Sequence, residues 1–402
     1  MKPVIFVFSL AYQPYLGGAE LALQEIIERL PDYRFRVYTA YALKHFSTPH
    51  SLPREEGSER VRIIRVGPRG RLVCQYGFPF FALLRALRDA RSVTPSLLWG
   101  MLESYGGITA LLFQRFFRAP VPYLLTMQSG DSEMFWRLRT WFWRPIYRLV
   151  YTRANAIQAI SSFLARRAEA MGAASRVITV IPNGVQVDRF SKHISPDERS
   201  AIRHSWGLTD AQDFSIITSS RLVHKNGIDT LIKGYAQWRT AQPSLRARLI
   251  IAGKGPQESW LRALARSLPI ASEILFLGEI PYAQLPRYLQ SADIFARVSR
   301  SEGLGIAFLD AMAAGIPVIA PLIGGIPDFL RHNETGLAVR VDDPHDVARA
   351  LARLAEDPAL RTRLATTASA LVQSYFSWDA VTRRMRDLFE GARVPMRKPQ
   401  PI

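Results

Sequence analysis

Short apolar runs, glycine-bearing turns and amphipathic stretches alternate along most of this chain. The apolar runs are short and rich in β-branched and aromatic side chains, a composition that favours buried strands over helices. Strands are therefore predicted at 4–10, 36–41, 97–100, 123–127, 156–160, 177–181, 215–219, 248–252, 274–277, 294–298 and 317–320. Helices are predicted between them, at 19–30, 229–239, 257–266, 283–291 and 346–355, and after them at 377–390. Because strands that alternate with helices build parallel sheets covered on both faces, the pattern predicts an α/β fold.

The alternation forms two series, separated by an irregular stretch at about 184–210. That stretch holds Asn183-Gly184, Ser195-Pro196 and Gly207, which are turn signals, so we place the linker there. A chain of 402 residues is long enough for two domains that each bury a core. The predicted organisation is an N-terminal domain over 1–184, a C-terminal domain over 200–376 and a disordered tail at 394–402, which is rich in proline and basic residues.

The formal net charge is +18, which is compatible with nucleic acid, an anionic membrane surface or anionic substrates as partners. Only seven of the 52 basic residues are lysine, and such an arginine bias also follows from genome composition. The charge therefore does not select among these partners. The single cysteine, Cys74, excludes an intrachain disulfide.

The apolar run at 4–10 is interpreted as the first strand, with a signal peptide as the alternative. The run is at the short end for a signal peptide, and no small-residue cleavage site follows it. No apolar stretch reaches the roughly 20 residues of a membrane-spanning helix. We expect a cytoplasmic protein, either soluble or peripheral on the inner face of the cell membrane.

Two turns that follow predicted strands have residues suited to phosphate groups. Gly17-Gly18 joins the first strand to the first helix, where a bare backbone lets a ligand approach the helix N–H groups. A plain tight turn is the alternative there. Arg221 and Lys225 follow the strand at 215–219 and offer two cations at its carboxyl end, where ligands bind in doubly wound sheets. A solvated basic turn is the alternative for this second site.

A pair of carboxylates marks a third candidate site. Glu302 precedes a glycine-rich helix start, and Asp310 lies eight residues later. Eight helical residues rotate by about 800°, or about 80° beyond two turns, so both acids are expected to reach one cleft. Carboxylates accept hydrogen bonds from sugar and ribose hydroxyls. The alternative for Glu302 is an ordinary acidic residue at a helix N-terminus.

The segment 133–169 contains no acidic residue between its ends, and its arginines are interleaved with aromatic residues. Such a composition suits an anionic bilayer surface. A core helix with an arginine-rich outer face is the alternative. The residues assigned here to acceptor or membrane contacts are Asp131, Arg137, Arg139, Trp141, Trp143, Arg144 and Arg148.

Other chemistries lack their motifs in this sequence. The seven histidines show no zinc-binding spacing, and neither a P-loop nor a Gly-x-Ser-x-Gly elbow is present. The turn at 17–18 is not the three-glycine dinucleotide fingerprint, which disfavours a nicotinamide enzyme. We therefore expect no metal, no other cofactor and no nucleic-acid partner.

Taken in order, these motifs resemble glycosyltransferase family 4, a retaining family with the GT-B fold of two Rossmann-like domains facing across a cleft. The resemblance covers most of the chain, and its pieces lie at 17–20, 160–161, 180–185, 221–227, 251–256, 276–278, 292–293, 302–310, 324–325, 334–337 and 376–378. The ordered set is highly specific, although no single piece is decisive. The resemblance also implies that a last helix, at about 377–393, packs back on the N-terminal domain.

The resemblance implies a donor site for a nucleotide sugar. Glu302 would contact hydroxyls of the donor sugar, Asp310 would bind the ribose, and Arg221 with Lys225 would hold the diphosphate. The catalytic set implied in this way is Glu302, Arg221, Lys225 and Gln128. The donor-binding set is Gly17, Gly18, Arg221, Lys225, Gly253, Gly255, Ile280, Glu302, Gly303, Leu304, Gly305 and Asp310.

Three positions depart from the family pattern. Asp310 is one methylene shorter than the family's second glutamate, and Asn226 stands where many members have lysine. Gln128 lies in a loop that often holds a histidine, and an amide cannot act as a general base. These departures bear on the ribose contact and on the level of activity.

The combined interpretation is a metal-independent, retaining glycosyltransferase that moves a hexosyl group from a UDP- or GDP-sugar to a glycan or lipid-linked acceptor of the cell envelope. No motif places a second carboxylate as nucleophile, so front-face transfer is expected. A GT-B phosphorylase or epimerase and a non-catalytic GT-B subunit remain as alternatives.

Overall fold

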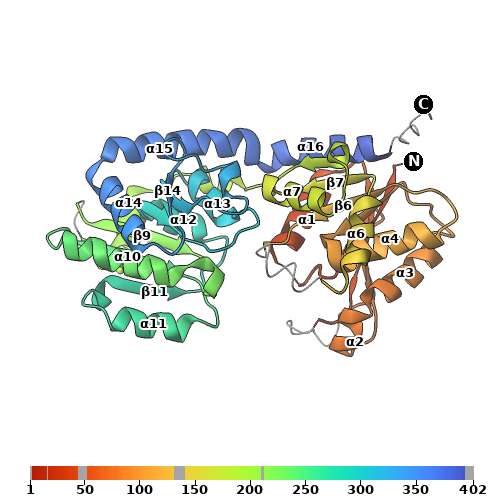
Figure 1. Ribbon diagram of the computed structural model, residues 1–402, viewed down its shortest axis with the longest axis horizontal. Coiled ribbons are helices and arrows are strands. Elements are labelled where there is room, and N and C mark those ends of the chain that lie inside the picture. The colour runs from red at the N-terminus through yellow and green to blue at the C-terminus, as the bar shows by residue number, and fades with distance from the viewer. Residues whose placement is uncertain (1, 16, 44–51, 131–140, 210–211, 394–402) are drawn as a thin grey trace. The chain divides into compact units, whose positions relative to one another are not determined.

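The computed structural model describes residues 2–15, 17–43, 52–130, 141–209 and 212–393 (Figure 1). The chain divides into two compact units, of which unit 1 holds 1–183 and 379–402 and unit 2 holds 184–378. Each unit is built on one sheet flanked by helices. The predicted pair of doubly wound α/β domains is confirmed.

The sheet of unit 1 has the strand order β3-β4-β2-β1-β5-β6-β7-β8. All its pairs are parallel except β3 with β4 at one edge. The central strands β1, β5 and β6 are buried along their whole length, as expected of strands covered on both faces. The strands are β1 (Val4–Phe8), β2 (Arg34–Ala40), β3 (Glu55–Gly57), β4 (Val61–Val66), β5 (Leu97–Met101), β6 (Tyr123–Met127), β7 (Ala156–Ala159) and β8 (Ile178–Val180).

The helices of unit 1 bury apolar stripes against this sheet. The ring of Phe6 on β1 lies edge-on to Tyr38 and Phe113, at centroid distances of 5.3 and 6.0 Å, so that β1, β2 and α4 share one core. The helical elements are α1 (Gly18–Arg29), α2 (Arg71–Tyr76), α3 (Phe78–Asp89), η1 (Leu102–Gly106), α4 (Gly107–Phe116), α6 (Arg144–Thr152), α7 (Ser162–Ala170), η2 (Ser175–Val177) and α16 (Trp378–Arg393).

The last helix, α16, belongs to unit 1 from Asp379 onward. Its Phe389 ring packs at 5.0 Å from the Trp99 ring and at 5.6 Å from the Tyr33 ring. Arg386 of the same helix pairs with Asp32 at 3.3 Å. The last described helix therefore completes part of the core of unit 1, against Tyr33 and the β5 residue Trp99.

The sheet of unit 2 is parallel throughout, with the order β11-β10-β9-β12-β13-β14. The first strand of the unit, β9, lies at the centre, and the order runs outward from it in both directions. The switch between the two directions falls between β9 and β12, where doubly wound sheets bind ligands. The strands are β9 (Phe214–Ser219), β10 (Ala247–Ala252), β11 (Ile274–Gly278), β12 (Ile294–Ala296), β13 (Val318–Pro321) and β14 (Leu337–Val339).

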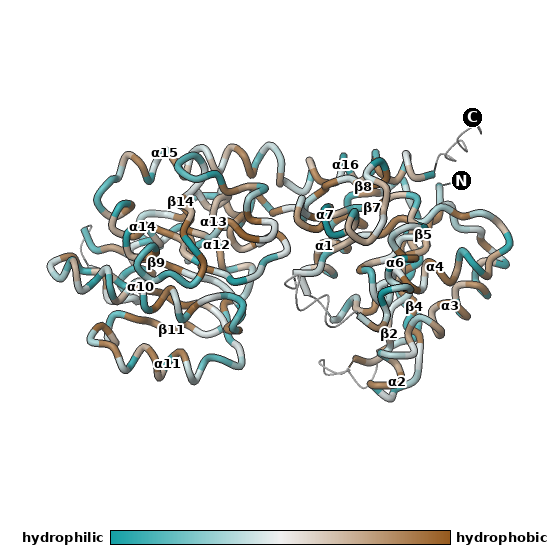
Figure 2. The backbone as a smooth tube through the Cα atoms, viewed as in Figure 1, coloured by the Kyte–Doolittle hydropathy of each residue, from teal (hydrophilic) through white to brown (hydrophobic). Residues whose placement is uncertain are grey.

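The helices of unit 2 cover both faces of its sheet. The outer helices α10 and α11 alternate between hydrophilic and hydrophobic residues along the tube, as helices with one buried side do (Figure 2). The helical elements are α8 (Val187–Ser191), α9 (Pro196–Ser205), η3 (His224–Asn226), α10 (Ile228–Ala241), α11 (Glu258–Arg266), η4 (Ala271–Glu273), α12 (Leu285–Ser291), α13 (Ile306–Ala313), η5 (Ile326–Asp328), α14 (Pro344–Glu356), α15 (Pro358–Leu371) and η6 (Val372–Phe376).

The structure adds elements that the hydrophobic pattern did not predict. β3 and β14 are only three residues long, and β4 carries two arginines within its apolar run, so none of the three has a clear strand signal. The stretch expected as a linker holds α8 and α9, which belong to unit 2. The predicted tail at 394–402 lies outside the described residues. Among the described helices, none combines the length and apolar character that crossing a bilayer requires.

Candidate functional site

Four loops of unit 2 converge at the carboxyl edge of its parallel sheet. They are 220–227 after β9, 253–256 after β10, 297–305 after β12 and 322–325 after β13. Arg221 and Lys225 follow β9, and Glu302 follows β12, so these three predicted site residues flank the switch point of the sheet. The structure thus brings together the basic turn and the first carboxylate.

The basic turn presents its two cations outward. The side chains of Arg221 and Lys225 are exposed, and neither has a hydrogen-bond or ion-pair partner among the described residues. The turn itself is held from within, because the side chain of Asn226 donates to the carbonyl of Arg221 at 2.6 Å. Gly227 has φ +64, and a Cβ there would meet the carbonyl oxygen of Val298 at 2.0 Å. Only glycine fits this close approach of the turn to the chain that leaves β12.

A further arginine fixes the back of the same turn. Arg300 donates its backbone N–H to the carbonyl of Lys225 at 2.7 Å, and its guanidinium pairs with Asp229 and Asp342, each at 2.7 Å. Burial would raise the pKa of Asp229, but hydrogen bonds and charge from Arg300 outweigh burial and lower it. The guanidinium of Arg300 is therefore engaged in ion pairs within unit 2, whereas the side chains of Arg221 and Lys225 have no such pairs among the described residues.

Glu302 lies in the loop before α13, with its side chain 13% exposed. Its carboxylate forms an ion pair with Arg297. Its carbonyl accepts a 3.2 Å hydrogen bond from the N–H of Gly325, and a Cβ on Gly324 would meet that carbonyl oxygen at 1.8 Å. The glycine turn at 324–325, a weak signal in the sequence, thus packs directly on the backbone of Glu302.

The predicted helical geometry of the two acids is wrong. The helix α13 begins at Ile306, so Glu302 is not on it and no two-turn rotation relates Glu302 to Asp310. Gly305 caps the helix in a left-handed conformation, φ +100, which delays the helix start beyond the glycines. The sequence pattern located both acids but not the loop between them.

Asp310 is buried in the middle of α13, with only 2% of its surface exposed. Its Oδ1 accepts a 3.1 Å hydrogen bond from the hydroxyl of Tyr282. Burial raises the pKa of Asp310 to about 8, and the Tyr282 hydroxyl acts against that rise. The ribose contact assigned to Asp310 stays a prediction, and its partner Tyr282, which the sequence reasoning missed, lies in the loop between β11 and α12.

The N-terminus of α13 is available to an anion. No side chain caps it, and its first turn has no acidic residue. Gly303, Leu304 and Gly305 lead into it and are all buried, with Leu304 only 2% exposed. Because the first amides of a helix have no partner within the helix, this end carries partial positive charge and free donors.

Gly253 and Gly255, which were predicted to bind the donor, lie in the loop after β10, where neighbouring backbone leaves no room for a Cβ atom. A Cβ on Gly253 would meet the carbonyl oxygen of Ser220 at 1.9 Å, and one on Gly255 would meet that of Leu222 at 2.3 Å. These glycines let the loop pack against the start of the basic turn. Ile280 lies half-buried in the loop after β11, two residues before Tyr282. Contacts of these three residues with a donor stay predictions.

In unit 1 the predicted glycine turn lies at the N-terminus of α1, at the carboxyl end of β1. The N–H of Gly17 is not free, because it donates to the carboxylate of Glu20 at 2.9 Å. Burial raises the pKa of Glu20, against the backbone hydrogen bonds that it accepts. The amide of Gly17 is therefore occupied, and the contacts of Gly17 and Gly18 with a donor stay predictions. Gly18 is open, since a Cβ there would meet no atom within 4 Å.

Gln128 directly follows β6, at the same edge of the unit 1 sheet. Its Oε1 accepts a 2.8 Å hydrogen bond from the side chain of Asn183. Its Nε2 is buried and has no partner among the described residues. The amide nitrogen therefore keeps its two N–H donors unused, which fits a hydrogen-bonding role and not that of a base.

The arginine–aromatic segment is partly described. Asp131, Arg137 and Arg139 lie outside the described residues. Trp141 and Trp143 are 75% and 55% exposed. Arg144 and Arg148 on α6 are exposed too, and α6 buries only Val150 and Tyr151. The alternative of a core helix with an arginine-rich face does not describe residues 141–149, because their large apolar side chains are exposed as well.

Arg297 also belongs to the candidate site, although the sequence reasoning did not identify it. It follows β12, is 8% exposed, and reaches both Glu302 and Asn226. Its signal was an arginine at the end of an otherwise apolar strand, where a buried cation needs a partner.

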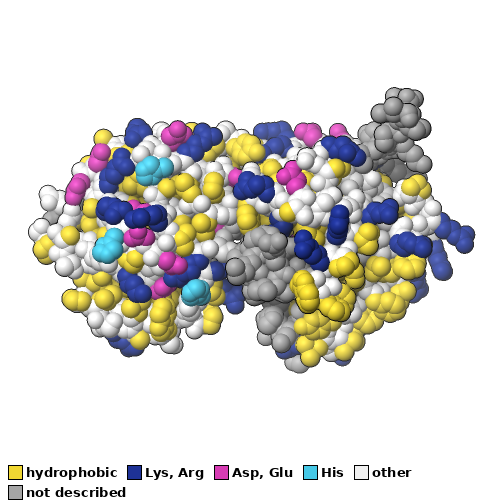
Figure 3. Space-filling view, in the orientation of Figure 1, with side chains coloured by type: hydrophobic (Ala, Val, Ile, Leu, Met, Phe, Trp, Pro, Cys, Tyr) yellow, Lys and Arg dark blue, Asp and Glu magenta, His cyan; other side chains and the backbone are white. Residues whose placement is uncertain are grey.

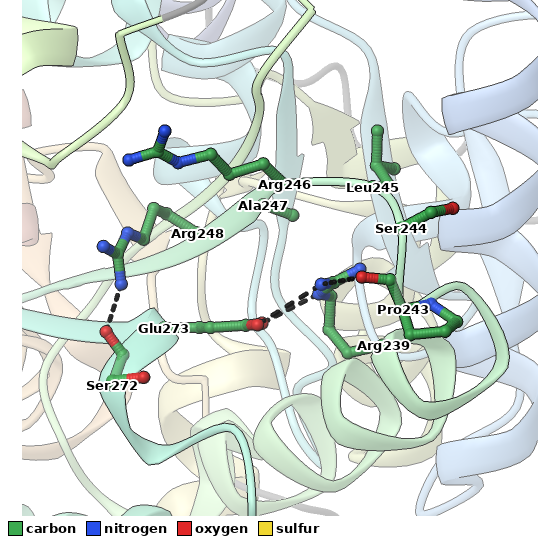
Figure 4. A pocket seen from close by; sticks show the side chains of 9 residues that line it. All are labelled: Arg239, Pro243, Ser244, Leu245, Arg246, Ala247, Arg248, Ser272 and Glu273. Atoms are coloured by element: carbon green, nitrogen blue, oxygen red, sulfur yellow. Dashed lines mark hydrogen bonds and ion pairs between the residues drawn. The ribbon is translucent and has the colours of Figure 1, made fainter.

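A cavity of about 310 Å³ lies elsewhere on unit 2 (Figure 4). It is lined by residues before β10 and β11, at the amino edge of the sheet, and its Arg239 and Glu273 pair with each other at 2.8 Å. Ligands of doubly wound sheets bind at the opposite edge, so this cavity is separate from the site. The described residues contain no group of three or more metal-ligating side chains.

Unit 2 thus carries a basic turn, a carboxylate and an uncapped helix N-terminus at the switch point of its sheet, and a chain of two doubly wound units has the organisation of the GT-B fold. Solved structures support that fold. The Anabaena protein HepE in complex with UDP has a TM-score of 0.78 and 19% identity, covering 96% of this chain and 99% of its own. Sucrose-phosphate synthase from Thermosynechococcus elongatus has a TM-score of 0.78 and 20% identity, covering 96% of this chain and 98% of its own.

Two family descriptions match the chain: Glycosyltransferase Family 4 over residues 16–189 and Glycosyl transferases group 1 over residues 201–371. Among similar proteins, a Corynebacterium glutamicum protein is 34% identical over 62% of this chain and 65% of its own length. Its name is GDP-mannose-dependent monoacylated alpha-(1-6)-phosphatidylinositol monomannoside mannosyltransferase.

A Mycolicibacterium smegmatis protein is 30% identical over 63% of this chain and 68% of its own length. It is named GDP-mannose-dependent alpha-(1-6)-phosphatidylinositol monomannoside mannosyltransferase. The matched region spans about 65% of the length of the first of these relatives. The chain belongs to glycosyltransferase family 4 and has the GT-B fold, as the sequence predicted.

Proposed function

We propose that this protein is a retaining glycosyltransferase that moves a hexosyl group from a nucleotide sugar to a lipid-linked acceptor without a metal ion. The observation that carries the proposal is the set of groups at the switch point of unit 2. Two cations with no partner in the described part of the chain, a carboxylate and an uncapped helix N-terminus suit a diphosphate bound to a sugar. Family membership supports the same reaction class.

The chemistry follows from the charges that develop during transfer. The bond between the sugar C1 and the phosphate oxygen breaks, and an acceptor hydroxyl oxygen forms the new bond to C1. The negative charge that grows on the leaving diphosphate faces Arg221, Lys225 and the N-terminus of α13, which are oriented before the reaction begins. The acceptor attacks on the side where the phosphate departs, and the departing phosphate oxygen takes the proton of the acceptor hydroxyl.

We propose GDP-mannose as the donor to test first. The support is the printed names of the sequence relatives, which are GDP-mannose-dependent mannosyltransferases. The fold neighbour HepE was solved with UDP, so a UDP-hexose is the competing donor. The same relatives act on phosphatidylinositol mannosides, which supports a glycolipid acceptor for this chain.

A glycolipid acceptor lies in a bilayer, and exposed residues of unit 1 suit contact with a bilayer surface. In α2 and α3, Leu72, Val73, Tyr76, Phe80 and Leu84 are each more than half exposed. Figure 3 shows hydrophobic side chains gathered over the region of these helices, with basic side chains beside them. Residues 60–88 contain seven arginines and no acidic residue.

The same surface continues toward the arginine–aromatic segment. Helix α2 packs on α3, α3 on α4, and α4 on α6, so the four helices are consecutive neighbours. Phe116 at the end of α4 is 61% exposed, and Phe142 before α6 is 80% exposed. We infer that these helices form a peripheral docking surface for an anionic membrane, with apolar side chains in the headgroup region and arginines at the phosphates.

Thermal-shift measurements with GDP, UDP and ADP, and with their hexose conjugates, test the proposed donor site. A nucleotide at one hundred times its dissociation constant stabilises the protein by about 2.7 kcal/mol. We expect a selective shift that Mg²⁺ does not change, and then transfer of labelled mannose from GDP-mannose to phosphatidylinositol-containing vesicles.

Each other result has a definite meaning. Release of free sugar phosphate from donor and phosphate would indicate a phosphorylase, and conversion of donor alone would indicate an epimerase. Folded protein that binds no nucleotide would favour the non-catalytic alternative. A product with inverted anomeric configuration would contradict front-face transfer.

A further inference from the structure

Arg297 is a buried cation in the middle of the candidate site. It follows β12, and its side chain is 9% exposed. A guanidinium at such a depth is costly unless its hydrogens and its charge are matched. Its polar contacts match the charge and several of these hydrogens, and two of them are with Glu302 and with Asn226 of the basic turn.

The guanidinium is oriented by four groups. Its Nη2 forms the ion pair with Oε2 of Glu302 and donates to Oδ1 of Asn226 at 3.2 Å. Its Nε donates to the hydroxyl of Ser299 at 3.0 Å. Its Cζ lies 5.1 Å from the ring centroid of Phe308. The four partners come from the basic turn, the loop after β12 and helix α13, so the guanidinium joins three parts of the site.

The ion pair uses only one oxygen of the Glu302 carboxylate. Oε2 contacts Arg297, while Oε1 has no hydrogen-bond partner among the described residues. The carboxylate is thus anchored on one side and left open on the other. An open carboxylate oxygen is an acceptor for a hydroxyl group, and the anchored oxygen fixes its direction.

The second link runs to the basic turn. Asn226, which accepts from Arg297, is 3% exposed and donates to the carbonyl of Arg221. A hydrogen-bonded chain therefore connects Glu302 through Arg297 and Asn226 to the backbone of the residue that presents one of the free cations. An asparagine fits this chain because it accepts on one side and donates on the other.

We propose that Arg297 is a positioning residue for the donor site: it orients Glu302 toward the donor sugar and ties Glu302 to the Arg221 turn. The proposal rests on the proposed function, since it assumes that Glu302 accepts hydroxyls of a nucleotide-bound hexose. Arg297 acts through Glu302, so its removal affects recognition of the sugar more than recognition of the nucleotide.

The test compares the affinity for GDP with that for GDP-mannose, and the affinity for UDP with that for UDP-glucose, by titration calorimetry. The variants are Arg297→Met, Glu302→Gln, the double variant and Arg297→Lys. In both single variants we expect the affinity for the nucleotide sugar to fall about 10-fold or more, with that for the free diphosphate nearly unchanged. In the double variant we expect no further fall, because the two residues act as one unit.

The lysine variant separates positioning from packing. A lysine keeps the charge near Glu302 but cannot contact Ser299 and Asn226 in one plane. We expect Arg297→Lys to recover part of the sugar selectivity that Arg297→Met loses. If the methionine variant does not fold, the double variant replaces it, because both of its side chains are neutral. It should then bind like Glu302→Gln alone.

Three results separate the possible failures. Wild-type protein that binds neither nucleotide sugar would overturn the proposed function itself. Wild-type binding with an unaffected Arg297→Met variant would overturn only the role of Arg297. Equal losses for the free diphosphate and the nucleotide sugar, adding to those of Glu302→Gln, would assign Arg297 to the phosphates and contradict the positioning role.

Discussion

Tyr282 donates a 3.1 Å hydrogen bond to the carboxyl group of Asp310, and burial raises the pKa of that group to about 8. At neutral pH Asp310 is therefore mostly a neutral acid, which can donate a hydrogen bond as well as accept one. Sequence comparison alone presents Asp310 as a shortened carboxylate. In the structure Asp310 is buried and protonated at neutral pH, and this protonation changes its hydrogen bonding more than the shorter side chain does.

Asp310→Asn is expected to change how stability depends on pH. An unfolded chain loses this proton near pH 3.9, whereas the folded protein keeps it to about pH 8. Between those values the unfolded state binds fewer protons, so the free energy of unfolding falls as pH rises, by at most about 1.4 kcal/mol per unit. Below that window the carboxyl group contributes no pH dependence, and above about pH 8 the loss is complete.

Urea denaturation at about pH 5 and about pH 7 measures this effect. We expect the wild type to lose more stability over this interval than the asparagine variant does. Equal losses in both proteins would mean that Asp310 is already ionised in the folded state. Tyr282→Phe removes the group that opposes the rise of the pKa of Asp310, so its slope should extend to higher pH.

Gly324→Ala is expected to disturb the site through the backbone of Glu302. Gly324 has φ +54, and a Cβ would meet the Glu302 carbonyl oxygen at 1.8 Å. Gly315→Ala is the matched control, because Gly315 has φ +76 but no atom lies within 4 Å of its Cβ position. Both variants bear a left-handed strain of about 1–2 kcal/mol.

Only Gly324→Ala must also displace the backbone of Glu302, because only its Cβ would meet that backbone. We expect Gly315→Ala to lower the melting temperature and keep wild-type affinity for the nucleotide sugar. Gly324→Ala should lower both. The idea that the 324–325 turn supports the site would be abandoned if the two variants bound the donor equally well.

Arg221→Met and Lys225→Met are expected to weaken binding of the free nucleoside diphosphate. Each exposed cation has no partner among the described residues, so its removal costs the fold little. A lost hydrogen bond to a charged phosphate is worth about 1.5–3 kcal/mol, or about 10- to 150-fold in affinity. Lys233→Met, an exposed lysine on α10, is the control. Unchanged diphosphate affinity in both variants would restore the interpretation of a solvated basic turn.

Trp141→Ser with Trp143→Ser is expected to reduce binding to vesicles. The two side chains are 75% and 55% exposed, and Trp260→Ser on α11 of unit 2 removes another exposed indole, 50% exposed, as the control. We expect the double variant to lose affinity for phosphatidylglycerol vesicles by about 10-fold or more, because interfacial aromatic side chains add apolar burial. Sedimentation with the vesicles measures it.

Arg144→Gln with Arg148→Gln tests the charge of the same surface. Each arginine near an anionic bilayer contributes about 1 kcal/mol, so the pair should lose about 30-fold in affinity. The loss should disappear on neutral phosphatidylcholine vesicles. Wild-type protein that binds neither vesicle would remove the membrane surface from the proposed function.

The fold could be predicted from the sequence because its strands are short apolar runs bounded by turns. The run at 123–127 matches β6 (Tyr123–Met127) residue for residue. β14 (Leu337–Val339) was missed because its three residues are not part of a longer apolar run, unlike those of β8 and β12, which lie within the predicted runs 177–181 and 294–298. The stretch with Ser195-Pro196 was taken for a linker, yet this pair starts α9, where Ser195 caps the helix and proline occupies its first turn.

Several residues of the candidate site could be predicted from the sequence, but the contacts that they make could not. Arg221, Lys225 and Glu302 stand beside strand ends, and the doubly wound order brings strand ends together. That Glu20 occupies the N–H of Gly17 depends on a local capping geometry that a glycine pair does not reveal. The role of Arg297 depends on side-chain packing between two loops, which no pattern along the chain encodes.

The contact of Phe389 with Trp99 and Tyr33 determines when unit 1 can finish folding during synthesis of the chain. The strand that carries Trp99 leaves the ribosome long before the helix that carries Phe389, and the whole of unit 2 is made between them. Unit 1 cannot complete its core until the last helix has been translated. Tyr33 and Trp99 therefore lack their packing partner Phe389 while the whole of unit 2 is being synthesised.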